Sequence, residues 1–147
     1  MDDNRNLQRF VDAQEPVFAE VRAELRAGCK RGHWMWFVFP QIAGLGHSAT
    51  ARFYAISSRA EAAAYLAHPI LGPRLRECCR LVTLVEGRSA RQIFGSPDDM
   101  KFRSSLTLFA AVASSDAAGA ASDNAIFTSA LEKYFGGAPD ELTLARL

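Results

Sequence analysis

Cysteine and long apolar stretches are scarce in this sequence, and each shortage excludes a class of protein. The three cysteines are odd in number and two of them are adjacent, so they form no disulfide framework and do not match the ligand spacing of a zinc site. No apolar run approaches the roughly 20 residues that a membrane-spanning helix needs. The N-terminus lacks the basic and apolar regions of a signal peptide. We therefore expect a cytoplasmic protein that does not enter a membrane.

An excess of one charge is absent as well. Lysine and arginine together number 17 and the acidic residues 16, so the net charge is +1. This balance argues against a membrane-surface partner and against a sequence-specific nucleic-acid partner. Only Lys30, Lys101 and Lys133 are lysine, which leaves fourteen arginines. That excess is typical of planar contacts to carboxylate or phosphate, or it reflects a GC-rich genome.

The motifs of well-known catalytic and metal sites are missing too. His33, His47 and His68 are widely spaced, and the chain has neither an HExxH pair, a GxSxG elbow nor a phosphate-binding loop. The "GLG" at residues 44–46 lacks the third glycine of a dinucleotide fingerprint. We expect no metal and no cofactor.

Helical periodicity, by contrast, runs through most of the chain. Ser58 with Glu61 and Ser89 with Gln92 have the pattern of capping boxes, and Ser96-Pro97-Asp98-Asp99 has the pattern of a helix start. The predicted helices cover about 4–14, 16–27, 58–68, 73–86 and 89–95, one from 96 with Phe102, Leu106, Phe109 and Ala113 as its stripe, one around 126–134, and a last turn capped by Asp140 that buries Leu142, Leu144 and Leu147. Residues 114–122 have the composition of a mobile loop. The fold class expected is mainly α, in a single domain over residues 1–147.

The segment 34–56 is the exception to this periodicity. In "HWMWFVFPQ", residues 33–41, the alternation of large side chains from Trp34 to Phe39 predicts a short buried strand or extended segment. The stretch "ATARFYAI", residues 49–56, fits either a strand or a helix.

The aromatic segment is also the first candidate for a binding site. Most of it must be core, because six large apolar side chains in water would carry a sizeable penalty. Lys30, Arg31 and His33 precede it, however, and Gln41 follows it. Aromatic surface next to cations suits stacking on a base and holding a phosphate. We expect one tryptophan, Trp34 or Trp36, to face a cleft together with Gln41.

The second candidate is "SPDDMKFRSS", residues 96–105. On a helix, Lys101, Ser104 and Ser105 share a face apart from the Phe102 stripe, so they can present a cation and hydroxyls to a cleft. Asp98 and Asp99 either act as acid or base there or simply satisfy the N-terminus of the helix.

Six stretches together resemble the bacterial family named domain of unknown function 1810, some members of which carry the label calpastatin. They are "LQRFVDAQ", "KRGHWMWFVFPQIAGLG", "ATARFYAI", "YLAHPILGPRL", "IFGSPDDMKFRSSLTLFA" and "FGGAPDELTL". The resemblance implies a compact, mainly helical cytosolic protein. Calpastatins are disordered inhibitors, whereas this composition folds.

A weaker resemblance links "WFVFP", the glycine turn, "SATARFYA" and "KF" to the NADAR proteins. That resemblance implies action on N-glycosidic bonds of ADP-ribose-type or phosphoribosylamino compounds. The chain departs from the NADAR pattern where Thr50 and Ala51 stand in place of a glutamate and a histidine.

Two hypotheses follow. The first is a protein that binds or hydrolyses a nucleotide-like N-glycoside, such as ADP-ribose or a phosphoribosyl compound. Its base pocket would use Trp34, Trp36 or Phe39, its phosphate site Arg52, Lys101 and Arg103, and its catalytic carboxylate Asp98 or Asp99. Gln41 and Ser105 are further ligand-binding candidates. For this hypothesis Trp36 and Lys101 must lie together. The second hypothesis is a non-catalytic protein-interaction module.

Overall fold

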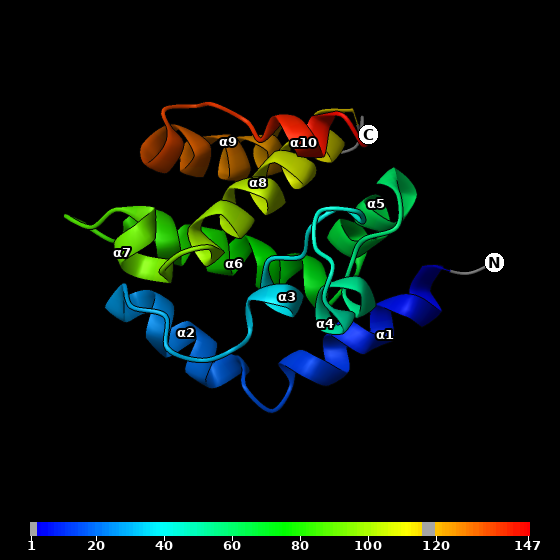
Figure 1. The fold of residues 1–147 in the computed structure, drawn as a ribbon, viewed down its shortest axis with the longest axis horizontal. Coiled ribbons are helices and arrows are strands. Elements are labelled where there is room, and N and C mark those ends of the chain that lie inside the picture. Colours follow the sequence, from blue (N-terminus) through cyan, green and yellow to red (C-terminus); the bar gives the residue numbers. More distant parts are fainter. Residues whose placement is uncertain (1–2, 116–119) are drawn as a thin grey trace.

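The helices of this protein follow the capping and periodicity signals of its sequence. A computed structural model describes the backbone of residues 3–115 and 120–147 and the side chains of residues 7–113 and 124–147. Figure 1 shows the arrangement of its helices. They are α1 Asp3–Gln14, α2 Phe18–Ala27, α3 Met35–Val38, α4 Ala49–Phe53, α5 Arg59–Ala67, α6 Leu71–Leu84, α7 Ala90–Phe94, α8 Asp98–Ser115, α9 Ala120–Phe135 and α10 Glu141–Leu144. The expectation of a single, mainly α-helical domain is confirmed.

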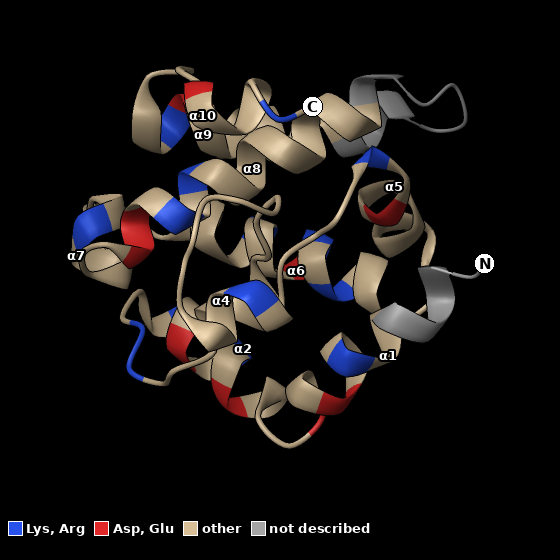
Figure 2. Cartoon of the chain, turned by 45° about the vertical axis from the view of Figure 1, so that its right-hand side comes forward, with Lys and Arg blue, Asp and Glu red and all other residues tan. Residues whose placement is uncertain are grey.

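Helix α8 is the centre of the fold. It packs against α9, α5, α7, α10 and α3, and in Figure 1 it crosses the middle of the molecule between α9 above and α6 below. Its predicted stripe, Phe102, Leu106, Phe109 and Ala113, is fully buried. The charged residues of α8 fall at its N-terminal end, and Figure 2 shows both signs of charge on outer helices such as α1 and α5. Among the described residues no helix is both long and apolar enough to span a bilayer.

Three predicted helix caps form as expected. The Ser58 side chain accepts a hydrogen bond from the amide of Glu61, Ser89 and Gln92 make a complete capping box, and Asp140 accepts from the amide of Thr143. The carboxylate of Glu61 does not return to Ser58. It accepts instead from the amide of Ser57 and pairs with Arg9 at 3.1 Å.

The aromatic segment contains a helical turn and not a strand. The amide of Val38 donates to the carbonyl of Trp34, and that of Phe39 to the carbonyl of Met35. The turn places Met35 and Val38 in the core three positions apart, a spacing that the alternating pattern does not describe. The strand-like pairing that the structure describes in segment 34–56 is an isolated parallel bridge between Ile42 and Ile56.

The structure shows the conformation of the ambiguous stretch 49–56 and corrects both ends of the predicted loop at 114–122. Residues 49–53 of "ATARFYAI" are helical, as α4, with Ser48 as the N-cap. The predicted loop at 114–122 is too long, because α8 continues to Ser115 and α9 begins at Ala120; residues 116–119 lie outside the described part.

The expectation that the last helix buries its leucines is wrong for two of them. Leu142 and Leu144 are 66% and 40% exposed, whereas Thr143 is fully buried. The reason is the cap. The Asp140 carboxylate binds both the amide and the hydroxyl of Thr143, which turns the face of Thr143 inward.

Candidate functional site

A cleft of about 540 Å³ opens where α3, the 45–48 loop, the start of α8 and α10 meet. Its polar and aromatic lining comes from Trp36, Gln41, His47, Ser48, Lys101, Ser104 and Asp140. Its apolar lining includes Leu45, Met100 and Leu142. Small-molecule sites have this size and this mixture of apolar wall with a few convergent polar groups.

The ammonium of Lys101 and the ring of Trp36 are the central pair of the cleft. The Lys101 Nζ atom lies 4.8 Å from the centroid of the Trp36 ring, within the range of a cation–π contact. Both residues are partly buried. They come from α3 and α8, 65 positions apart in the chain, so the requirement that they lie together is met.

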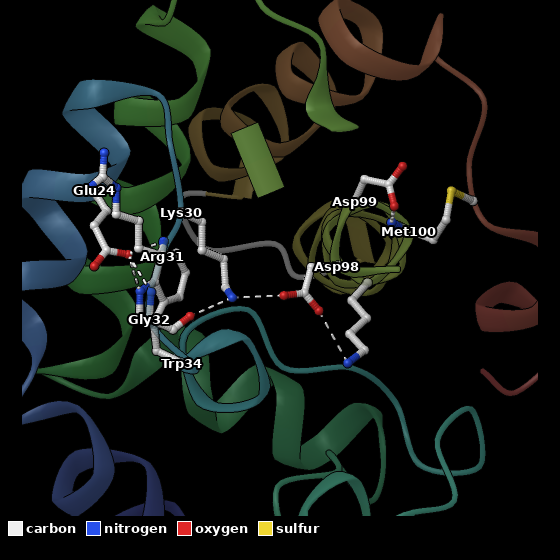
Figure 3. Close-up of polar contacts among 9 residues, drawn as sticks. Glu24, Lys30, Arg31, Gly32, Trp34, Asp98, Asp99 and Met100 are labelled. Carbon is white, nitrogen blue, oxygen red and sulfur yellow. Dashed lines mark hydrogen bonds and ion pairs between the residues drawn. The ribbon is translucent and has the colours of Figure 1, made fainter. Parts of the chain in front are cut away.

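A second tryptophan and a second lysine repeat this pairing deeper in the protein. Lys30 Nζ lies 5.2 Å from the ring centroid of Trp34 and donates to the carbonyl of Gly32 at 2.6 Å. The Asp98 carboxylate joins the two pairs, with one oxygen 2.8 Å from Lys30 and the other 3.3 Å from Lys101. Figure 3 shows the Asp98 side chain directed at Lys30. We call Trp34, Lys30, Asp98, Lys101 and Trp36 the lysine–tryptophan cluster.

Glu24 of α2 anchors the loop that leads into this cluster. One of its carboxylate oxygens accepts from the amides of Arg31 and Gly32 and from the indole of Trp34, at 2.8, 3.0 and 2.9 Å (Figure 3). Burial alone would raise the pKa of Glu24. The three donors and the charge of Lys30 outweigh it, so the pKa lies below the ordinary value. Glu24 therefore holds Trp34 as a carboxylate.

Asp140 is the cleft residue that reasoning from sequence assigned only to capping. Its Oδ2 atom accepts from the Ser104 hydroxyl at 3.0 Å and from the Thr143 hydroxyl at 2.6 Å, so α8 and α10 are joined beside the cleft. The capping pattern locates Asp140 at a helix start. It contains no sign that this start lies against Ser104 and lines the same cleft as Lys101.

Of the predicted site residues, Trp36, Gln41 and Lys101 line the cleft, and the others do not. Trp34 and Phe39 are buried in the core at 2% and 1% exposure. Asp99 turns to the amide of Met100, on the other side of the helix end from Asp98 in Figure 3. Neither Asp98 nor Asp99 lines the cleft.

The three remaining candidates also lie outside its lining. The guanidinium of Arg103 donates to the carbonyls of Ala138 and Pro139, which secures the turn before α10. Ser105 is 1% exposed, and its hydroxyl has no hydrogen-bond partner among the described residues. Arg52 is exposed on α4. Within the part of the chain that the structure describes, no three His, Cys, Asp or Glu side chains group as metal ligands.

Comparison with known proteins identifies a family. The chain is similar in structure to the conserved hypothetical protein Rv1873 from Mycobacterium tuberculosis, with 55% sequence identity, a TM-score of 0.90, and 97% of this chain and 96% of the other covered. Among curated proteins none matches. The family described as "Protein of unknown function (DUF1810)" matches residues 4–147, and the chain therefore belongs to this family.

Proposed function

We propose that this protein binds an anionic, ring-containing small molecule of the nucleotide-like N-glycoside class, such as ADP-ribose or a phosphoribosyl compound, in the cleft at Lys101. The observation that carries the proposal is the Lys101 ammonium over the ring of Trp36, 4.8 Å from its centroid, with both side chains lining a cleft of about 540 Å³. A phosphate needs a cation and hydrogen-bond donors, and a sugar or base needs a flat apolar surface.

The other groups of the cleft support the same ligand class. Gln41 contributes an amide that both donates and accepts, and Ser48 and Ser104 contribute hydroxyls. These groups suit the hydroxyls of a ribose. The Lys101 side chain lines the cleft and is 25% exposed although it pairs with Asp98, so a ligand in the cleft can contact it.

Hydrolysis of the bound N-glycoside is the catalytic form of this proposal. Glycoside hydrolysis passes through an oxocarbenium-like transition state that a nearby carboxylate stabilises. Asp98 does not line the cleft and is paired with the ammonium groups of Lys30 and Lys101, whereas Asp140 lines the cleft. We therefore assign the carboxylate role to Asp140 in place of Asp98 or Asp99.

Binding is tested by thermal shift and calorimetry with ADP-ribose, NAD, ribose 5-phosphate and phosphate. Ligand at a thousand times its Kd should stabilise the fold by about 4 kcal/mol. Lys101→Met and Trp36→Ala should abolish the shift. Lys133→Met is the matched control, because that lysine binds the carbonyls of Thr83 and Val85 away from the cleft. No shift with any of these compounds would refute the proposal.

Hydrolysis is tested by release of free base from ADP-ribose-type substrates. Asp140→Asn should keep the ligand and lose turnover, because asparagine still caps a helix but carries no charge. Asp99→Asn, the same substitution outside the cleft, should leave turnover unchanged. Equal turnover in the two variants would remove Asp140 from the reaction.

A non-catalytic interaction module is the second candidate, and Leu84 is the observation that favours it. This side chain is 72% exposed and lines a mainly apolar hollow of about 340 Å³ between α6 and α9, with Ala125 and Ile126. If the hollow binds a second copy, sedimentation velocity should show self-association that Leu84→Glu abolishes. A monomer at all concentrations would argue against this use of the hollow.

A further inference from the structure

A second cleft, of about 520 Å³, lies beside the first one. His33, Trp36, Phe37, Thr50, Phe53 and Tyr54 supply most of its lining. Trp36 lines both clefts. On α4, Thr50 and Phe53 are three positions apart and share a face, whereas Ala51, which lines the first cleft, points about 100° further round the helix from Thr50. Trp36 and α4 are therefore the partition between two hollows.

The hollows also approach each other beneath α4. A narrow chamber of about 10 Å³ has Trp36, Gln41 and Lys101 in common with the first cleft and Trp36 and Tyr54 in common with the second. The cation of the first cleft and the aromatic wall of the second therefore border the same small space.

The second cleft has the character of a site for a flat ring. Phe53 is 58% exposed, and its ring meets Tyr54 edge-on at 4.8 Å. Tyr54 in turn lies 5.4 Å from Phe37, so aromatic side chains form a continuous wall. An exposed phenylalanine next to such a wall leaves apolar surface in water, which a stacked ring would cover. Thr50 and His33 add hydrogen-bonding groups of the kind that read the edge of a base.

We propose that this second cleft binds the nucleobase of the same ligand whose anionic group lies at Lys101. This inference rests on the proposed function and narrows it: the ligand is a nucleotide with a base, in preference to a bare sugar phosphate. The shared Trp36 argues for one ligand over two, because one indole borders both the cationic and the aromatic hollow. The cation is on one side of the partition and the exposed aromatic ring on the other, as a molecule with one anionic and one aromatic end requires.

The test compares ligands with and without a base in the intact protein. Calorimetry gives the Kd of AMP, ADP-ribose and ribose 5-phosphate for the parent protein, Phe53→Ala and Lys101→Met. Loss of one stacking partner should weaken AMP and ADP-ribose between about 5-fold and 100-fold in Phe53→Ala. Ribose 5-phosphate should bind that variant as it binds the parent protein. Lys101→Met should weaken all three.

Leu84→Ala removes another exposed apolar side chain and is the control, with no change expected for any ligand. If AMP and ribose 5-phosphate bind equally well and Phe53→Ala weakens neither, the second cleft takes no base, and the proposed function stands alone. If Phe53→Ala weakens both ligands to the same degree, its effect is structural and the inference fails. No binding of any ligand to the parent protein overturns both proposals. If aromatic peptides bind at Phe53 and AMP does not, the second cleft is a site for a protein partner and the inference of a nucleobase site fails.

Discussion

At the scale of single residues, the surroundings of Lys30 suit an ammonium group better than a guanidinium group. Two of the three lysines meet at Asp98, and each lies over a tryptophan. Lys30 brings its ammonium to the Gly32 carbonyl, the Asp98 carboxylate and the Trp34 ring at once. A compact ammonium with three rotatable donors can do this, whereas the planar fork of a guanidinium is built for two parallel bonds. We therefore expect arginine to be a poor substitute at this position.

Replacing Lys30 by methionine should be the more damaging of two matched substitutions. Its side chain is 8% exposed, so its loss leaves a carboxylate with a missing buried partner, at a cost of about 3 kcal/mol in the free energy of unfolding. Lys101→Met should cost about 1 kcal/mol, because Lys101 is 25% exposed and Asp98 retains Lys30. Urea denaturation of both variants measures the difference. Equal losses would contradict a structural division between the two lysines.

At the scale of elements, α3 is a helical turn that the local sequence pattern does not predict. Ser58, Ser89 and Asp140 mark their helix starts because a cap and its partner lie three positions apart. A single turn such as Met35–Val38 has too few hydrogen bonds to be stable alone. Its anchors come from earlier helices: Glu24 holds Trp34, and the Gln14 amide donates to the carbonyl of Phe37 at 2.7 Å. No pattern within the nine residues contains those partners, so alternation there wrongly suggested a strand.

Glu24→Gln should destabilise the protein at neutral pH and have no effect in acid. The pKa of Glu24 is lower in the folded chain than in the unfolded one, so the carboxylate contributes stability above its ordinary value near 4.5 and loses it as the pH falls through the folded pKa. Urea denaturation at pH 7 and in steps below pH 4.5 should show the two proteins converging. Glu20→Gln on the same helix is the control and should differ little from the parent at either pH. A loss for Glu24→Gln that persists unchanged in acid would mean that the charge is not the cause.

At the scale of the whole molecule, the helices could be predicted and the cleft could not. The stripe on α8 specifies a buried central helix, and its four predicted residues are all in the core. The cleft, however, joins Trp36, Lys101 and Asp140, which are far apart in the chain. Periodicity states which face of each helix is buried. It does not state which helix ends meet, so the choice between Trp34 and Trp36, and the place of Asp140, required the assembled fold.

Two phenylalanines test this assembly. Phe39 is buried against Trp34, Phe94 and Phe102, with ring centroids 6.3, 5.9 and 5.0 Å away, so it connects the N-terminal part of the chain to α7 and α8. Phe39→Ala should cost about 3–5 kcal/mol of unfolding free energy. Phe53→Ala, at 58% exposure, should cost about 0.5 kcal/mol. Urea denaturation measures both losses, from the shift of each midpoint when the m-value is unchanged. A cost for Phe53→Ala close to that of Phe39→Ala would mean that Phe53 belongs to the structural core.

If the proposed ligand binds, the carboxylate that Lys30 and Lys101 share determines how its anionic group reaches Lys101. Lys101 already has a counter-ion in Asp98, so a phosphate that binds Lys101 must displace or share this carboxylate. The affinity of the phosphate is then the difference between the attraction of Lys101 for phosphate and its attraction for Asp98. The exchange leaves Asp98 with Lys30, so no carboxylate is abandoned in the interior. Binding by counter-ion exchange weakens as salt rises. It also implies that Asp98→Asn, which removes the competitor, should bind phosphate compounds more tightly while the fold itself becomes less stable.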